Sequence, residues 1–126
     1  MTALRLAVIA AGLVMSTVAN TDAVAADPNA GKGVFTRCAA CHTINKGGVN
    51  GLGPNLFGVV GRKAGTKPDF GYSGAMKKAG FAWTPQKLDA YIAHPAAVVP
   101  GNRMAFAGIP NAKDRADLIA YLATLK

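Results

Sequence analysis

The sequence predicts an all-α fold, in which three or more helices are joined by long loops. Two cap-then-proline pairs, Asp27-Pro28 and Thr84-Pro85, are typical of helix starts. Leucines recur at helical spacing near the C-terminus. No segment shows the alternating apolar pattern of a strand. The length of 126 residues indicates one domain.

Residues 1–26 are typical of a cleaved secretory signal peptide. Arg5 supplies the positive charge, residues 6–15 are apolar or small, and small residues precede a cleavage site after Ala25 or Ala26. An uncleaved anchor is the alternative, but polar residues interrupt the run before the ~20 apolar residues that a bilayer requires. We therefore expect export to the periplasm and no stable membrane insertion after cleavage.

Residues 27–126 form the expected domain, which is strongly basic. The chain carries 14 Lys and Arg against 6 acidic residues, a net charge of +8. A basic surface favours acidic partners and speeds their association at low salt. No nucleic-acid motif accompanies the charge, so we expect no nucleic-acid partner.

The first helix is predicted over residues 28–40, although Gly31 and Gly33 lower its intrinsic stability. Residues 42–70 are rich in glycine and contain two prolines, so they are predicted to be irregular. The same segment holds several apolar side chains. A long irregular segment of this kind indicates that it surrounds a bound group.

Two further helices follow. The first begins at Thr84-Pro85, carries Leu88 on its apolar face, and is ended by His94-Pro95. The second is capped by Asn111 and places Leu118 and later leucines on one face.

The stretch C-A-A-C-H holds both cysteines of the chain, Cys38 and Cys41, directly before His42. A zinc site requires four ligands, and only His94 remains to complete the set. A thioredoxin-like pair requires a strand before it, which this chain lacks. Covalent haem attachment fits better, because two thiols can hold the two vinyl groups of one porphyrin while the histidine binds its iron.

The sixth iron position has three candidates in the sequence: Met76, Met104 and His94. A buried methionine is usually core filler, and a histidine at a helix end usually interacts with the helix dipole. Met104 differs because it lies in an irregular segment after a Pro-Gly turn, far enough from His42 in sequence to reach the other ring face.

The chain resembles the class I c-type cytochromes, close to the mitochondrial cytochrome c and bacterial cytochrome c2 group. The resemblance runs from Gly31 to the C-terminus. It is carried by C-A-A-C-H-T, G-P-N-L, G-R-K, Trp83, P-G-N-R-M, F-A-G-I and D-L-I-A-Y-L, in that order.

The resemblance implies the cytochrome c fold, three to five helices and long loops around one covalent haem c, and it assigns the site. Cys38 and Cys41 hold the haem, and His42 and Met104 bind its iron. The remaining roles are those of side and main chains around the ring: the carbonyl of Pro54 orients His42, Tyr91 points at the methionine sulfur, and Arg62, Tyr72 and Trp83 hydrogen-bond a haem propionate.

The function implied by the resemblance is that of a soluble, monomeric one-electron carrier and not of an enzyme. Its expected partners are acidic redox proteins of the respiratory chain, a bc1-type complex and a terminal oxidase or reaction centre. The alternative is a catalytic or ligand-sensing haem protein, which requires a displaceable sixth ligand.

Overall fold

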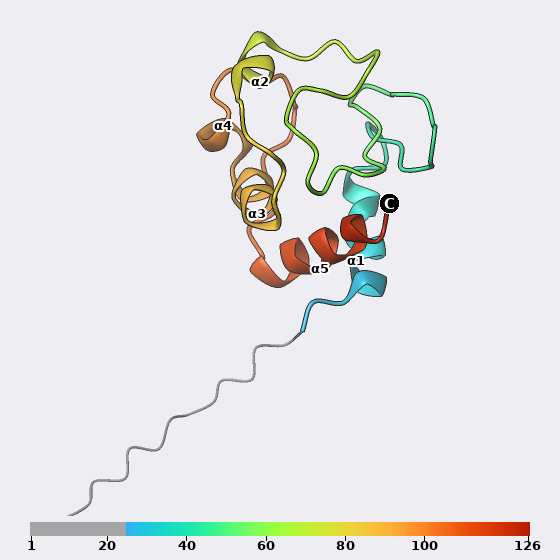
Figure 1. The fold of residues 1–126 in the computed structure, drawn as a ribbon. Helices are drawn as coiled ribbons and strands as arrows, with labels where there is room; N and C mark the ends of the chain where they lie inside the picture. The colour runs from blue at the N-terminus through green and yellow to red at the C-terminus, as the bar shows by residue number, and fades with distance from the viewer. Residues whose placement is uncertain (1–24) are drawn as a thin grey trace, which may run out of the picture.

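The computed structural model describes residues 25–126, so the signal peptide predicted over residues 1–26 lies almost entirely outside the described residues. Five α-helices and one 3-10 helix occur in this part: α1 Pro28–Val34, η1 Phe35–Arg37, α2 Gly74–Lys78, α3 Pro85–Ala93, α4 Pro95–Val98 and α5 Ala112–Ala123. The only strand-like pairing over the same range is an isolated bridge between Lys63 and Ala82. The predicted all-α class is therefore confirmed (Figure 1).

The first helix is shorter than its prediction over residues 28–40. It starts as expected, because the Asp27 side chain accepts a hydrogen bond from the Asn29 N–H, and Pro28 takes the first position. After α1 the chain tightens into η1, where the Cys38 N–H bonds the carbonyl of Phe35, three residues back, at 2.8 Å. The two cysteines consequently lie in a turn and not on a helix.

The later helices begin where the caps predict them. The Thr84 hydroxyl accepts from the Lys87 N–H at 3.1 Å, and the Asn111 side chain accepts from the Asp114 N–H at 3.0 Å. The short helices α2 and α4 were not predicted, since four or five residues are too few to show a helical period.

Helices α1 and α5 cross at one end of the molecule (Figure 1). Gly31 makes the crossing possible, because a Cβ at this position would overlap the main-chain oxygen of Asp117. The Asp117 carboxylate is buried, accepts from the Asp27 N–H at 2.8 Å and pairs with Lys113. These hydrogen bonds, that of the Asp27 N–H first, hold the pKa of Asp117 below its usual value.

The segment between η1 and α2 is irregular, as predicted, and forms the upper right part of the molecule in Figure 1. Helices α2, α3 and α4 lie on the other side of the fold. Within residues 25–126, no helix has the length and apolar character needed to cross a bilayer.

The two glycines of α1 provide a test of the helix crossing. Gly31→Ala forces a methyl group against backbone that cannot move aside, so we expect the free energy of unfolding to fall by about 3 kcal/mol. Gly33→Ala meets no neighbouring atom within 4 Å and should raise it by about 0.5–1 kcal/mol. Denaturant unfolding of the purified proteins measures both, and equal stabilities would contradict the crossing described here.

Candidate functional site

A cavity of about 580 Å³ lies between the irregular segment and the helices. Most of its lining is apolar, and several lining residues belong to the buried core, among them Leu88, Ile92, Leu118 and Leu122. Its volume falls in the range of pockets that enclose a cofactor. Core side chains on the wall of a cavity this large indicate that a bound group completes the core.

Cys38, Cys41 and His42 lie together on this cavity, as the motif requires. No disulfide joins the two cysteines; Cys38 is half-buried and Cys41 is exposed. Burial raises the pKa of the Cys38 thiol, with the charge of Arg37 opposing it.

The imidazole of His42 is oriented by the main chain. Its Nδ1 lies 2.7 Å from the carbonyl oxygen of Pro54, so Nδ1–H donates and Nε2 keeps its lone pair for a metal. Burial is the main cause that lowers the pKa of His42, which favours the neutral, ligating form. Gly53 packs against the flat ring, and any Cβ there would overlap the imidazole.

Met104 also lines the cavity, and its sulfur accepts a hydrogen bond from a hydroxyl. The Tyr91 hydroxyl donates to Met104 Sδ at 4.0 Å. Burial raises the pKa of Tyr91 to about 12, so the donor stays protonated at neutral pH. The main chain at Met104 is held by Asn102, whose side chain accepts from the Met104 N–H at 2.9 Å.

The other two candidates for the sixth position differ in their surroundings. Met76 lines the cavity and is buried in α2, where its N–H bonds the Ser73 hydroxyl. His94 is exposed at the end of α3 and does not line the cavity. The geometry therefore favours Met104 as the sixth ligand, and Met76 is an apolar side chain of the cavity wall.

Arg62, Tyr72 and Trp83 all line the same cavity. Arg62 is half-buried and donates to the carbonyls of Phe57 and Asn55 at 3.4 and 3.2 Å. No carboxylate lies within ion-pair distance of it in the part of the chain that the structure describes. Burial lowers the pKa of this guanidinium, so an anionic group beside it would be favourable. The cavity is therefore suited to a ligand with an acidic edge.

These residues fit a haem: two thiols, an imidazole and a thioether border one apolar cavity, which also presents a cation that has no acidic partner among residues 25–126. Zinc fits poorly, because no three or more His, Cys, Asp or Glu side chains among residues 25–126 are arranged so that they could hold a metal ion. Sequence reasoning missed Phe106 as part of the lining, whereas Leu52 belongs to the irregular segment that was predicted to surround a bound group and does line the cavity. Leu52 is 83% exposed, so it lies at the cavity mouth, and exposure of this kind has no signature in sequence.

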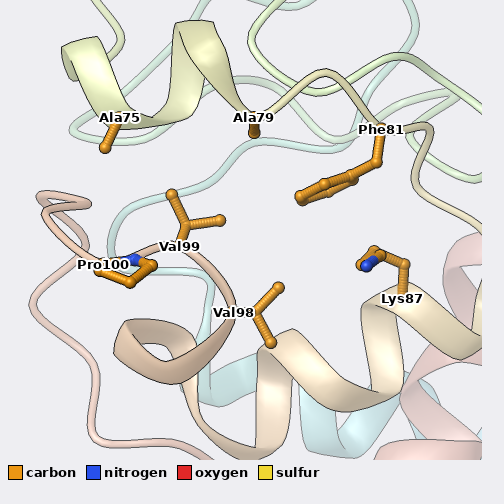
Figure 2. Close-up of a pocket in the computed structure, with 7 residues that line it drawn as sticks. All are labelled: Ala75, Ala79, Phe81, Lys87, Val98, Val99 and Pro100. Atoms are coloured by element: carbon orange, nitrogen blue, oxygen red, sulfur yellow. The ribbon is translucent and has the colours of Figure 1, made fainter.

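A second cavity, of about 340 Å³, lies between α2, α3 and α4 (Figure 2). Its lining is apolar except for Lys87, whose ammonium sits 4.7 Å from the centre of the Phe81 ring. No thiol, thioether or imidazole borders it. It therefore offers no metal ligand and is separate from the candidate site.

Known proteins resemble this chain over most of its length. The family described as Cytochrome c matches residues 28–126. Cytochrome c2 of Rhodomicrobium vannielii is 46% identical over 124 residues, which are 98% of this chain and 97% of that protein. Cytochrome c2 of Rhodoblastus acidophilus is 48% identical over 102 residues, covering 81% and 95% of the two chains.

Solved structures show the same fold. Cytochrome cH from Methylobacterium extorquens superposes with a TM-score of 0.73 at 44% identity, covering 78% of this chain and 98% of that one. Cytochrome c2 from Rhodospirillum centenum gives a TM-score of 0.75 at 34% identity, covering 79% and 98%. The resemblance inferred from sequence is confirmed.

Removal of the ligand tests whether the cavity needs filling. Replacing Cys38 and Cys41 together with serine removes the thiols that would hold a haem, and leaves core residues around an open cavity of about 580 Å³. We expect the variant to lose its cooperative thermal transition and most of its far-ultraviolet helical signal, because so short a chain with an unfilled core buries too little surface to stay folded. Trp83, the only tryptophan in the chain, lines the cavity, so its fluorescence should rise strongly once no haem lies beside it to quench it. A cooperative, wild-type-like transition in the colourless variant would contradict this role of the cavity.

Proposed function

Because the chain belongs to the cytochrome c family and so carries one covalently attached haem c, we propose that it is a one-electron carrier. The observation that carries the proposal is a single apolar cavity bordered by the two thiols, the imidazole of His42 and the thioether of Met104. Two strong protein ligands leave no iron position for a substrate. Such a site can exchange an electron and has no place to hold a reactant.

In this proposal Cys38 and Cys41 would hold the haem through thioether links, and His42 Nε2 and Met104 Sδ would bind its iron. A bound haem supplies one iron that alternates between Fe(III) and Fe(II). Pro54 fixes the direction of the imidazole through its carbonyl oxygen. Tyr91 donates a hydrogen bond to the methionine sulfur, which weakens the sulfur as an electron donor and favours the reduced state.

Arg62, Tyr72 and Trp83 are assigned to the acidic edge of the ring. The half-buried guanidinium of Arg62 compensates a carboxylate charge that would otherwise be costly inside the protein. The apolar lining excludes water and lowers the local dielectric, so the less charged reduced iron is favoured.

The rival function is ligand sensing or catalysis at a displaceable sixth position. The contact between the Tyr91 hydroxyl and Met104 argues against it, because it stabilises the methionine where it can bind iron. A far-red absorption band, which is expected of ferric haem bound by a thioether, distinguishes the two functions.

Met104→Ala provides the direct test of the carrier. The wild-type protein should show the far-red band and resist carbon monoxide in its reduced form. The variant should lose the band, bind carbon monoxide readily, and drop in midpoint potential by about 0.1 V or more, within the ~0.8 V that axial ligands span. Met76→Ala is the control, and it should keep the band. A wild-type protein that lacks the band and binds carbon monoxide would support the rival function.

The cellular setting of the proposal is periplasmic, with residues 1–26 removed as a signal peptide and residues 27–126 working as a monomer. The proposed partners are acidic redox proteins, a bc1-type complex as donor and a terminal oxidase or reaction centre as acceptor. Bacterial relatives named cytochrome c2 support this setting, as does the net charge of +8.

Charge predicts how association responds to salt. Because opposite charges steer the encounter, the association rate with an acidic redox partner should fall by about tenfold or more between ~0.01 M and ~0.3 M ionic strength. Stopped-flow oxidation of the reduced protein measures it. A rate that is independent of salt would exclude electrostatic docking.

A further inference from the structure

We propose that Arg115 is a positioning residue for Met104, because its guanidinium anchors the end of the irregular segment that carries the methionine. The inference rests on the proposed function, in which Met104 binds the haem iron. Arg115 belongs to α5 and does not line the cavity, so it acts through the main chain and not by contact with the ligand.

The methionine segment requires outside support. Residues 102–111 contain no regular secondary structure, so helix or sheet hydrogen bonds do not fix their path. Asn102 and Arg103 hold the upstream end, where the Arg103 guanidinium donates to the carbonyl of Gly71 at 3.1 Å. The downstream end reaches α5 through Ile109 and Pro110.

Arg115 makes three hydrogen bonds at that downstream end. Its Nη1 donates to the carbonyl oxygens of Ile109 and Pro110, each at 2.9 Å, and its Nε donates to Asp89 Oδ1 at 2.8 Å. The Arg115 side chain is 14% exposed and its bond to Ile109 is partly buried, whereas the Asp89 side chain is 49% exposed and Pro110 lies at the surface. One cation therefore joins the methionine segment and α3 to the start of α5.

Arginine is the side chain that this arrangement requires. Ile109 is 1% exposed, and a buried carbonyl left without a donor is costly. A rigid planar fork can serve two carbonyls and a carboxylate at once, whereas a lysine ammonium presents a single point and a glutamine carries no charge.

The residues that Arg115 anchors are also joined directly to α3, the helix that carries the hydrogen-bond donor to Met104. The Ile109 N–H donates to the carbonyl of Ile92 on α3 at 2.9 Å. Gly108, with φ of +108°, packs so closely on Ala93 that a Cβ would overlap its carbonyl oxygen. The same helix carries Tyr91, the donor to Met104 Sδ. By binding both the segment and Asp89, Arg115 fixes the thioether and its donor relative to each other.

The experiment compares Arg115→Gln and Arg115→Lys with Lys113→Gln in the haem-loaded protein. Lys113 is the matched control, because it is also a cation of α5 that pairs with an acid, but its partner is Asp117 of the same helix and not a residue of the methionine segment. The readouts are the far-red band, the rate of carbon monoxide binding to the reduced form, and amide hydrogen exchange at Ile109.

We expect carbon monoxide binding and Ile109 exchange to become about tenfold faster in Arg115→Gln, because hydrogen bonds from a charged donor are lost. Arg115→Lys should recover part of the loss, and Lys113→Gln should leave both rates within about twofold of wild type. The far-red band of Arg115→Gln should weaken on mild warming, below the unfolding transition.

Two outcomes overturn the inference and remain distinguishable. If the wild-type protein has the band and Arg115→Gln matches Lys113→Gln in both rates, the positioning role is wrong and the carrier function stands. If the wild-type protein itself lacks the band, Met104 is not the ligand, and both the function and the inference fail. Should Arg115→Gln not fold, Asp89→Ala removes the acceptor on α3 and should accelerate the same two rates, whereas no change would count against the inference.

Discussion

Side chains of the hydrophobic core also line the cavity that the two cysteines and His42 border. Leu88 and Ile92 of α3, and Leu118 and Leu122 of α5, are buried against one another and at the same time border a space of about 580 Å³. Packed protein interiors do not tolerate a void of this size, because its walls lose their contacts. The haem is therefore part of the core, and the helices are arranged to enclose it as much as to pack together.

This constraint explains why so little regular structure suffices. The irregular segment after His42 supplies apolar side chains to the cavity, and it is tied down by local contacts that do not need a sheet. Asn55 is an example: it is 1% exposed, and its side chain bonds Thr43, the carbonyl of Asn45 and the N–H of Phe57. The loop is thus shaped by buried polar bonds on one side and by the cofactor on the other.

Helix α3 connects the two ends of the site. The Tyr91 hydroxyl donates a hydrogen bond to the methionine sulfur. The carbonyl of Ile92 accepts one from the Ile109 N–H, and the Asp89 carboxylate accepts one from the guanidinium of Arg115 on α5. Helix α5 in turn crosses α1 at Gly31, and α1 leads through η1 into the turn that carries the two cysteines. The attachment site and the methionine segment are therefore positioned by one continuous set of packed helices.

The sequence by itself determined the features that depend on neighbours in the chain. The haem motif occupies five consecutive residues, and the caps at Asp27, Thr84 and Asn111 act on N–H groups two or three residues ahead, so both could be recognised without a fold. The end of the first helix was predicted too late, because the tightening at Phe35 depends on how the turn after it packs.

Only the tertiary structure decided which distant residues meet. It placed the hydroxyl of Tyr91 beside the sulfur of Met104 and left His94 outside the cavity, in agreement with the choice of Met104 that the sequence had already favoured. It also brought Arg115 to the carbonyls at the downstream end of the methionine segment. It brought Asp117 to the N–H of Asp27, 90 residues away in sequence. Such contacts depend on the path of the whole chain around its cofactor, and residue spacing carries no record of that path.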